Sequence, residues 1–258
     1  MANGERASDV ALHFSGREEV RANSFRRVWT QELNDVFADV AAYYDRANYV
    51  ASLGLWYVFR NSFLATITLQ SGQNQLDVCA GTNAVGIAML RKQPDLNVFA
   101  IDRSAAMQDV GRQRAAREGL HIESIIGDAH KLPFPDNHFD VVTLQWASRH
   151  LRVVELYQEI RRVLKPGGYF YQCDMLRPGS KLVEQLYYAY LRVSLSVTAV
   201  LFQSGATVRN YKQYFIDALS LFYSAEELSQ LLRHLGYENV SSKTLLGGMV
   251  GIHKAMKP

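Results

Sequence analysis

Cysteine is scarce in this sequence, and the charge is nearly balanced. Two cysteines, Cys79 and Cys173, occur among 258 residues and do not form a Cys-x-x-Cys pair. We therefore expect neither a disulfide framework nor a cysteine-ligated zinc site, and this content fits a reducing cytoplasm. The chain has 28 Lys and Arg residues and 25 Asp and Glu residues, so the net charge is only +3. Nucleic-acid-binding domains usually carry a strongly basic face, so we expect no nucleic-acid partner.

Long hydrophobic runs are also few. The first ten residues lack the apolar segment of a secretory signal, so the sequence predicts none. Residues 185–204 are apolar and about long enough to cross a bilayer. Arg192 in their middle would be costly in lipid, so we favour a buried or lid helix and keep a transmembrane helix as the alternative. With 48% hydrophobic and 21% charged residues, the chain has the composition of a globular domain.

A regular alternation of short apolar runs and helical segments starts near residue 75. The apolar runs predict strands, and the last helical segment between them ends at Lys165-Pro166-Gly167-Gly168. This alternation predicts an α/β fold with a doubly wound, parallel sheet. The predicted strands are residues 75–80, 97–101, 121–126, 139–145 and 169–173, and the predicted helices are residues 84–92, a segment ending near 118, and 153–164.

Other patterns occupy the two ends of the chain and one insertion. Residues 1–22 are polar without periodicity and predict a flexible arm, whereas residues 24–45 have the spacing of an amphipathic helix. Ser224 and Glu227 form the capping box of a later helix. The remaining expectations are an aromatic-rich helical insertion at about 180–222, a helix at 224–235, and closing strands near 239–245 and 249–254, all in a single domain of residues 23–258.

Three acidic residues fall where ligands bind in such sheets. Asp77 lies in the first predicted strand, Asp102 ends the second, and Asp128 follows the third. Ligands of open α/β sheets sit at the carboxyl ends of the strands, and an acid about 20 residues after a Gly-containing first turn can accept hydrogen bonds from a ribose. The alternative is that such an acid only caps a helix or is solvated.

The first turn, Gly81-Thr82-Asn83-Ala84-Val85-Gly86, narrows the choice of nucleotide. A phosphate loop needs a lysine after its last glycine, but Ile87 stands there. The dinucleotide fingerprint needs a glycine in place of Asn83, although Asn tolerates the left-handed backbone of such a turn. No basic residue flanks the turn to meet a diphosphate. A cofactor with an adenosine but no phosphate, S-adenosylmethionine (SAM), therefore fits better than NAD, and an NAD-dependent oxidoreductase stays a minor alternative.

Four segments resemble the successive motifs of class I SAM-dependent methyltransferases: LDVCAGTNAVGIAML, FAIDRS, GDAHKLPFPDNHFDVV and RRVLKPGG. The segment Tyr44-Asp45-Arg46-Ala47-Asn48, followed by Ser52, and the tail LLGGMVGIHKAMKP are similar to motifs of the ubiquinone/menaquinone-biosynthesis C-methyltransferases. The resemblance covers about residues 28–258. It implies a Rossmann-like sheet of seven mostly parallel strands flanked by helices, SAM as the cofactor, and a quinol ring as the methyl acceptor.

The resemblance also implies roles for individual residues. The acid matching Asp102 holds the ribose hydroxyls of the cofactor, and the acid matching Asp128 contacts the adenine amino group. Arg149, His150 and Tyr44 match the positions that act on the acceptor. The full set implied for cofactor binding is Asp77, Cys79, Ala80, Gly81, Asn83, Asp102, Arg103, Asp128, Ala129 and Gln145.

Methylation of a ring carbon is helped by deprotonation of a neighbouring hydroxyl, and an ordinary pKa of about 6.5 suits His150 as the base. Arg149 would orient a quinol oxygen, and Tyr44 would donate to the acceptor. The alternatives stay open: His150 packs at a helix start, Arg149 pairs with a surface acid, and Tyr44 closes the core. We expect an acceptor pocket, with an ordinary helix core as the alternative, from the aromatic residues of the insertion: Tyr187, Tyr188, Tyr190, Phe202, Tyr211, Tyr214, Phe215 and Phe222.

Several positions depart from the family pattern. Asn83 replaces a glycine, Asp174 replaces a glutamate, and His150 replaces an asparagine. These changes leave open another small-molecule acceptor, and Asn83 leaves open a non-methylating ligand-binding or interaction protein on the same fold. Contact of the insertion with a membrane surface and a homodimer also stay open, although no Lys/Arg-rich amphipathic face supports the former. Without an H-E-x-x-H motif or a close His pair, we expect no metal site.

Overall fold

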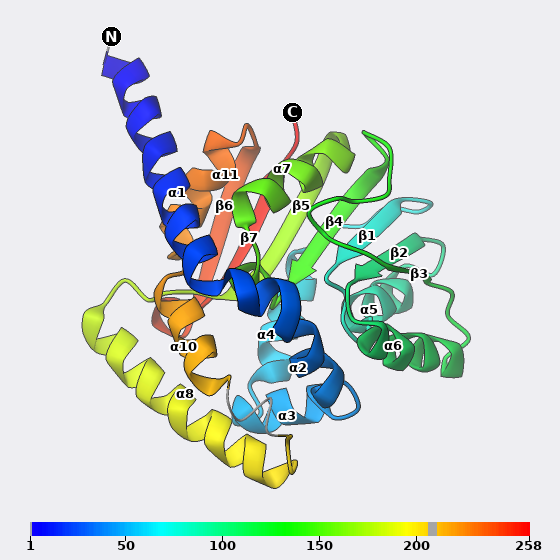
Figure 1. Cartoon of the computed structure of the whole chain (residues 1–258). Helices are drawn as coiled ribbons and strands as arrows, with labels where there is room; N and C mark the ends of the chain where they lie inside the picture. The colour runs from blue at the N-terminus through cyan, green and yellow to red at the C-terminus, as the bar shows by residue number, and fades with distance from the viewer. Residues whose placement is uncertain (1, 206–210) are drawn as a thin grey trace.

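The computed structural model describes residues 2–205 and 211–258, with side chains from residue 13 on. Its centre is a seven-stranded sheet in the order β3-β2-β1-β4-β5-β7-β6 (Figure 1). Strands β1 to β5 are parallel, whereas β7 is antiparallel to both β5 and β6. The predicted α/β class and the mostly parallel sheet are confirmed. The strands are β1 (Asn74–Val78), β2 (Asn97–Asp102), β3 (Glu123–Ile126), β4 (Phe139–Gln145), β5 (Leu164–Met175), β6 (Glu238–Leu245) and β7 (Val250–Met256).

Strand β5 begins earlier than the sequence predicts. Leu164 pairs with Phe139, and the register then shifts so that Tyr169 pairs with Val141. The extra residues form an irregular stretch of the strand in which Gly167 has a φ of 78°. A left-handed glycine and a proline therefore mark a bulge in β5, rather than a turn that precedes it.

Helices cover both faces of the sheet. In β4, Val142 and Leu144 belong to a core that includes α7 and α11, whereas Val141 belongs to a second core with α4 and α5. This alternation is the period of two expected of a strand buried on both faces. Helix α11 begins with the predicted capping box of Ser224 and Glu227. The helices around the sheet are α4 (Trp56–Thr66), α5 (Ala84–Lys92), α6 (Ala105–Arg117), α7 (Val153–Val163) and α11 (Ala225–His234).

Residues 2–27 form a helix, although residues 1–22 lack apolar periodicity in the sequence and predict a flexible arm. Helix α1 packs Phe14 and Arg21 into the interior. Arg21 donates hydrogen bonds to the carbonyl oxygens of Arg149 and Leu151, 3.1 and 3.0 Å away. Because the buried face of α1 includes the polar residue Arg21, its burial leaves no apolar periodicity in the sequence. The helix predicted at 24–45 is confirmed as helical but is divided: α1 (Ala2–Arg27), the π-helix η1 (Val28–Glu32), α2 (Leu33–Val40) and α3 (Tyr44–Ala51).

The described part of the insertion is mainly helical. Helix α8 (Lys181–Leu201) lies away from the sheet, next to α10 (Lys212–Ser220) and α3 (Figure 1). Residues 206–210 of the predicted insertion lie outside the described residues. No helix within the described ranges is long and apolar enough to cross a membrane. The short helices η2 (Ser148–His150) and η3 (Leu246–Gly248) complete the chain.

Candidate active site

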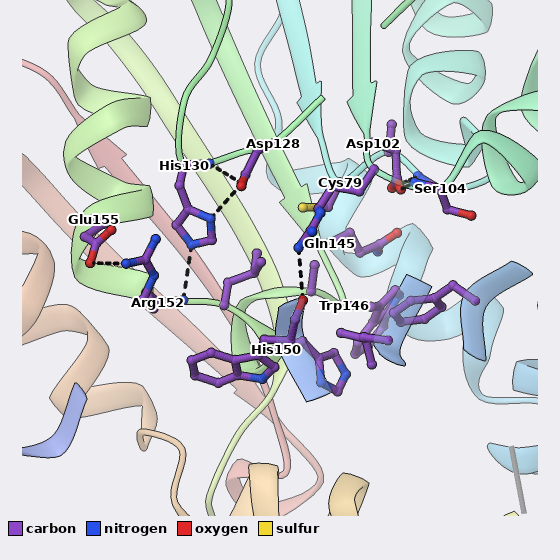
Figure 2. Close-up of a pocket in the computed structure, with 18 of the residues that line it drawn as sticks. Cys79, Asp102, Ser104, Asp128, His130, Gln145, Trp146, His150, Arg152 and Glu155 are labelled. Carbon is purple, nitrogen blue, oxygen red and sulfur yellow. Dashed lines mark hydrogen bonds and ion pairs between the residues drawn. The ribbon is translucent and has the colours of Figure 1, made fainter. Parts of the chain in front are cut away.

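A cavity of about 810 Å³ lies at the carboxyl ends of β1, β2 and β4 (Figure 2). Its wall includes the turn between β1 and α5, the end of β2, the segment after β3, and residues of α1, η1 and α2. This is the position at which open α/β sheets bind ligands. Its volume lies in the range of small-molecule and cofactor sites.

The turn after β1 depends on left-handed backbone conformations. Cys79, Gly81 and Asn83 have φ values of 53°, 52° and 56°. The Asn83 side chain points behind the turn, where its oxygen accepts a hydrogen bond from Gln108 Nε2 at 2.8 Å and its amide lies 3.3 Å from Ser124 Oγ. Asn83 therefore supplies the conformation that a glycine would supply, and its departure from the glycine pattern leaves the turn intact.

Asp102 joins this turn to the end of β2. Its two carboxylate oxygens accept hydrogen bonds from the backbone N–H groups of Gly81 and Ser104, each at 2.8 Å. Burial raises the pKa of Asp102, and these backbone donors oppose the rise. Each oxygen keeps a second lone pair, so the carboxylate can still accept from a ligand hydroxyl.

Asp128 lies on the same side of the cavity and is half exposed. It accepts hydrogen bonds from the backbone N–H of His130 at 3.0 Å and from His130 Nδ1 at 2.8 Å (Figure 2). Partial burial raises the pKa of Asp128, but the hydrogen bonds from His130 outweigh it and the pKa is lowered. The cavity therefore presents an ionised carboxylate here at neutral pH.

Asp77 is the most deeply buried acid of the cavity. Burial raises its pKa to about 7, although the Thr143 hydroxyl, which donates to Oδ1 at 2.8 Å, and the backbone of Gly86 lower it. Its Oδ2 makes no hydrogen bond of normal geometry within the described structure. A cationic ligand group would supply the missing partner, and the ammonium group of SAM is one.

Replacing Asp77 with Asn should remove a pH dependence of stability. Between about pH 4 and 7 the folded protein holds a proton on Asp77 that the unfolded chain releases, so stability falls as the pH rises through this window. At pH 5 the protonated acid and Asn are nearly isosteric, and the two proteins should unfold at similar urea concentrations. At pH 8 Asp77→Asn should be more stable by up to about 4 kcal/mol. If the urea midpoints of the parent and of Asp77→Asn differed by the same amount at pH 5 and at pH 8, the raised pKa of Asp77 would be contradicted.

Aromatic and aliphatic side chains form another part of the wall. Trp29, Leu33 and Phe37 come from η1 and α2, and Trp56 and Trp146 stack with ring centroids 5.0 Å apart. The prediction that aromatic residues of the insertion line the pocket is wrong for this cavity. Of those within the described residues, none lines it: Phe222 belongs to the main core and Tyr214 to a smaller cluster with Trp29.

Several buried polar atoms without partners belong to residues that line this cavity. Five lining side chains in the described part of the chain hold a buried atom that makes no hydrogen bond of normal geometry: Asp77 Oδ2, Gln145 Nε2, Trp56 Nε1, Trp146 Nε1 and His150 Nε2. Buried polar atoms in native proteins are nearly always paired. A ligand that carries complementary donors and acceptors would satisfy these five atoms.

The three residues predicted to act on the acceptor are neighbours, but they differ in access. Tyr44 and His150 line the cavity, whereas Arg149 does not. Arg149 forms a buried ion pair with Asp174 and donates to the Trp146 carbonyl at 3.0 Å. Burial alone would lower the pKa of the Arg149 guanidinium. The charge of Asp174 and its hydrogen bond outweigh burial, so the pKa of Arg149 is raised above its ordinary value. Arg149 is therefore a fixed cation behind the wall, not the partner of a surface acid.

Tyr44 and His150 are both neutral at physiological pH. Burial raises the pKa of Tyr44 to about 12, and the charge of Arg149 opposes the rise. Burial and the charges of Arg149 and Arg21 hold the pKa of His150 well below its ordinary value. The His150 ring packs edge-on against Phe37 and Phe215, with centroids 6.1 and 5.3 Å away.

The cavity brings together most of the cofactor residues predicted from the sequence. Asn83 and Ala129 do not line it, and Arg103 does so while donating to the Trp29 carbonyl at 3.0 Å. The contribution of η1 and α2 to the wall could not be predicted from the sequence, because helical spacing alone does not show which face meets the sheet. No group of three or more His, Cys, Asp or Glu in the described ranges is arranged to hold a metal ion. The predicted residues on the wall are Asp77, Cys79, Ala80, Gly81, Asp102, Arg103, Asp128 and Gln145.

This chain is similar to known methyltransferases. A family model described as the ubiE/COQ5 methyltransferase family matches residues 26–257. A demethylmenaquinone methyltransferase of Symbiobacterium thermophilum is 32% identical over 88% of this chain and 93% of its own length. The mitochondrial 2-methoxy-6-polyprenyl-1,4-benzoquinol methylase of Caenorhabditis elegans is 30% identical over 88% of this chain and 80% of its own length.

A solved structure agrees with the fold. The phosphoethanolamine N-methyltransferase 2 of Haemonchus contortus, in complex with S-adenosyl-L-methionine, matches with a TM-score of 0.60 at 15% identity, over 80% of this chain and 53% of that chain. At this identity the match concerns the fold alone. The family match over nearly the whole chain establishes a SAM-dependent methyltransferase, and the chain belongs to the ubiE/COQ5 methyltransferase family.

Proposed function

We propose that this enzyme methylates a ring carbon of a 1,4-quinol that carries an apolar side chain. The observation that carries the proposal is one cavity with carboxylates at one part of its wall and paired indole rings at another. The carboxylates suit the polar groups of SAM, and the aromatic wall suits a flat ring with an apolar substituent. The relatives from Symbiobacterium and Caenorhabditis, named for demethylmenaquinone and a polyprenyl benzoquinol, support this acceptor class.

The cofactor end of the site consists of acids with separate tasks. Asp102 would accept from the ribose hydroxyls, Asp128 from the adenine amino group, and Asp77 from the ammonium group. When bound, SAM supplies an activated methyl group, whose bond to sulfur breaks with its electron pair as the bond to the ring carbon forms and the ring proton leaves to a base. The chain mainly has to align donor and acceptor for this displacement. This scheme needs no metal ion.

The acceptor end combines exclusion of water with fixed hydrogen-bonding groups. Tyr44, as a neutral phenol, and His150 would contact the oxygens of the quinol. Arg149 would act from behind Tyr44 as a positioning residue, because its permanent charge favours negative charge that develops on a ring oxygen. The stacked indoles of Trp56 and Trp146 would pack against the ring or its side chain.

The proposal is tested with methyl-labelled SAM and a demethylmenaquinone analogue in reduced and oxidised form. Label on a ring carbon of the product, found by mass spectrometry only with the reduced acceptor, is the expected result. Label on oxygen, or equal labelling of the oxidised acceptor, would contradict quinol C-methylation. No label at all, in a protein that binds SAM in a titration, would favour another small-molecule acceptor.

The exposed face of α8 bears on where the enzyme meets such an apolar substrate. Apolar side chains on this face are largely exposed. The turn between α3 and α4 lies beside this face, because Ser194 Oγ donates to the Ala51 carbonyl at 2.7 Å, and the turn carries further exposed apolar side chains. Glu184, the sole acid of α8, is buried, whereas Lys181 and Arg192 are exposed. The exposed apolar residues are Leu182, Leu186, Tyr190, Val193, Val197, Val200 and Leu201 of α8, with Tyr49, Leu53, Leu55, Tyr57 and Val58 of the turn and its flanking helices.

We propose that this face docks on an anionic membrane from the cytoplasmic side. Exposed apolar area beside the cations Arg192 and Lys181, of which Lys181 pairs with Glu184, suits a lipid surface with negative head groups. The enzyme should sediment with phosphatidylcholine vesicles that contain phosphatidylglycerol, and less at high salt. Leu186→Glu with Val193→Glu should lower the bound fraction at least about tenfold, whereas Ile126→Glu, on exposed β3, should not.

A homodimer across the α8 face is the competing occupant. It predicts a dimer in solution without vesicles, which the two α8 glutamates convert to a monomer. Equal sedimentation of the parent and of the α8 variant with vesicles would overturn the membrane proposal.

A further inference from the structure

Hydrogen bonds link three buried side chains, of which Trp29 and His150 line the cavity and Tyr214 lies behind its wall. Trp29 Nε1 lies 2.9 Å from the Tyr214 hydroxyl oxygen, and that oxygen lies 2.7 Å from His150 Nδ1. The three residues belong to η1, α10 and η2, and each is at least nine-tenths buried. We refer to Trp29, Tyr214 and His150 as the relay. It connects the insertion to the cavity, although the insertion's aromatic residues do not line the wall.

The direction of each hydrogen bond in the relay follows from the donors. An indole N–H can only donate, so Trp29 donates to the Tyr214 oxygen. Burial raises the pKa of Tyr214, so its hydroxyl keeps its proton. His150 Nδ1 is the partner available to that proton. If Nδ1 donated instead, the Tyr214 oxygen would accept two bonds and its own buried proton would stay unpaired, at a cost.

The proton of His150 can then be placed. A neutral imidazole has one N–H, and His150 is neutral because its buried position and the charges of Arg149 and Arg21 disfavour the cation. Since Nδ1 accepts from Tyr214, the proton is on Nε2. This Nε2 atom is buried and unpaired in the described structure, in a residue that lines the cavity. It is a donor without an acceptor.

We infer that Trp29 and Tyr214 fix His150 as an Nε2–H hydrogen-bond donor that holds a ring oxygen of the methyl acceptor, and not as the base that removes its proton. The inference rests on the proposed function for the identity of the acceptor, but the tautomer does not depend on it. His150 touches the substrate in this scheme, whereas Tyr214 and Trp29 are positioning residues that act through it. The base for the quinol proton is then another group or water.

The tautomer is tested directly on the parent enzyme without acceptor. Long-range ¹H–¹⁵N NMR spectra of protein labelled at histidine distinguish Nε2-protonated from Nδ1-protonated rings, and the His150→Gln variant assigns the signal. The Nε2–H form is expected in the parent and a mixture in Tyr214→Phe. An Nδ1–H ring or a protonated ring in the parent overturns the inference, whatever the acceptor proves to be.

Two substitutions separate a donor from a base. Gln carries an N–H at the position of His150 Nε2 but takes up no proton near neutral pH. We expect His150→Gln to keep turnover within about tenfold of the parent and His150→Ala to lose at least about 100-fold. Equal losses in the two variants, with SAM binding intact, overturn the donor role and support a base.

The positioning role of Tyr214 needs a matched control. Tyr214→Phe should lower kcat about tenfold with little change in SAM affinity, because His150 loses its fixed tautomer. Tyr237→Phe removes another buried hydroxyl bond, the one to the Tyr157 carbonyl at 2.8 Å, away from the cavity. It measures the purely structural cost. Equal kcat losses in the two Phe variants overturn a positioning role, whereas failure of quinol methylation in the parent concerns the proposed function alone.

Discussion

Asp102→Ala should weaken SAM binding by roughly 100-fold or more. The carboxylate would accept from both ribose hydroxyls, and hydrogen bonds to a charged group contribute about 1.5–3 kcal/mol each. Isothermal titration measures the loss. Asp109→Ala is the matched control, because Asp109 is exposed on the neighbouring helix α6 and pairs with Arg112. Its affinity for SAM should equal that of the parent.

The structural role of Asp102 has to be separated from ribose binding. The Asp102 carboxylate also accepts hydrogen bonds from the backbone N–H groups of Gly81 and Ser104. Its loss would therefore loosen the turn even if Asp102 made no contact with the ribose. An S-adenosylhomocysteine analogue without the 2′-hydroxyl resolves this. The parent should bind the analogue more weakly than the natural ligand, and Asp102→Ala should bind the two equally. A variant that still discriminates between them would refute the ribose assignment.

The sheet could be predicted from the sequence because its strands are buried on both faces. A run such as Phe139–Gln145 is apolar at nearly every position, and few structures other than a central parallel strand accommodate it. The acids of the cofactor end follow from the same logic, since the ends of parallel strands meet at one edge of the sheet. The positions of Asp102 and Asp128 at this edge could therefore be predicted from strand order alone.

The N-terminal helix and the acceptor end could not be predicted in this way. Arg21 is fully buried. It donates hydrogen bonds to two carbonyl oxygens, and its guanidinium lies 5.3 and 4.9 Å from the ring centroids of Trp29 and Phe222. Such a residue reads as polar in any periodicity analysis. The insertion holds more aromatic residues than η1 and α2, but Phe222 meets the core beneath α11. Composition indicates that an apolar surface exists, and only packing shows which one faces the ligand.

Arg149→Met should destabilise the protein by about 3–5 kcal/mol. Asp174 is fully buried, and removal of its cation leaves an unpaired carboxylate in the interior. Urea unfolding at pH 8 measures the loss. Lys165→Met is the control, because the pair of Lys165 and Asp140 is partly exposed and should contribute less than about 1 kcal/mol.

The double variant Arg149→Met with Asp174→Asn distinguishes stability from catalysis. Neutralising Asp174 removes the buried charge, so at least half of the lost stability should return. Turnover should not return, and should stay at least about tenfold below the parent, because the cation behind Tyr44 is still missing. SAM affinity should match the parent, since neither residue lines the cofactor end of the cavity. If turnover recovered together with stability, Arg149 would serve the fold alone, and the charge that favours an anionic ring oxygen would have to come from another residue.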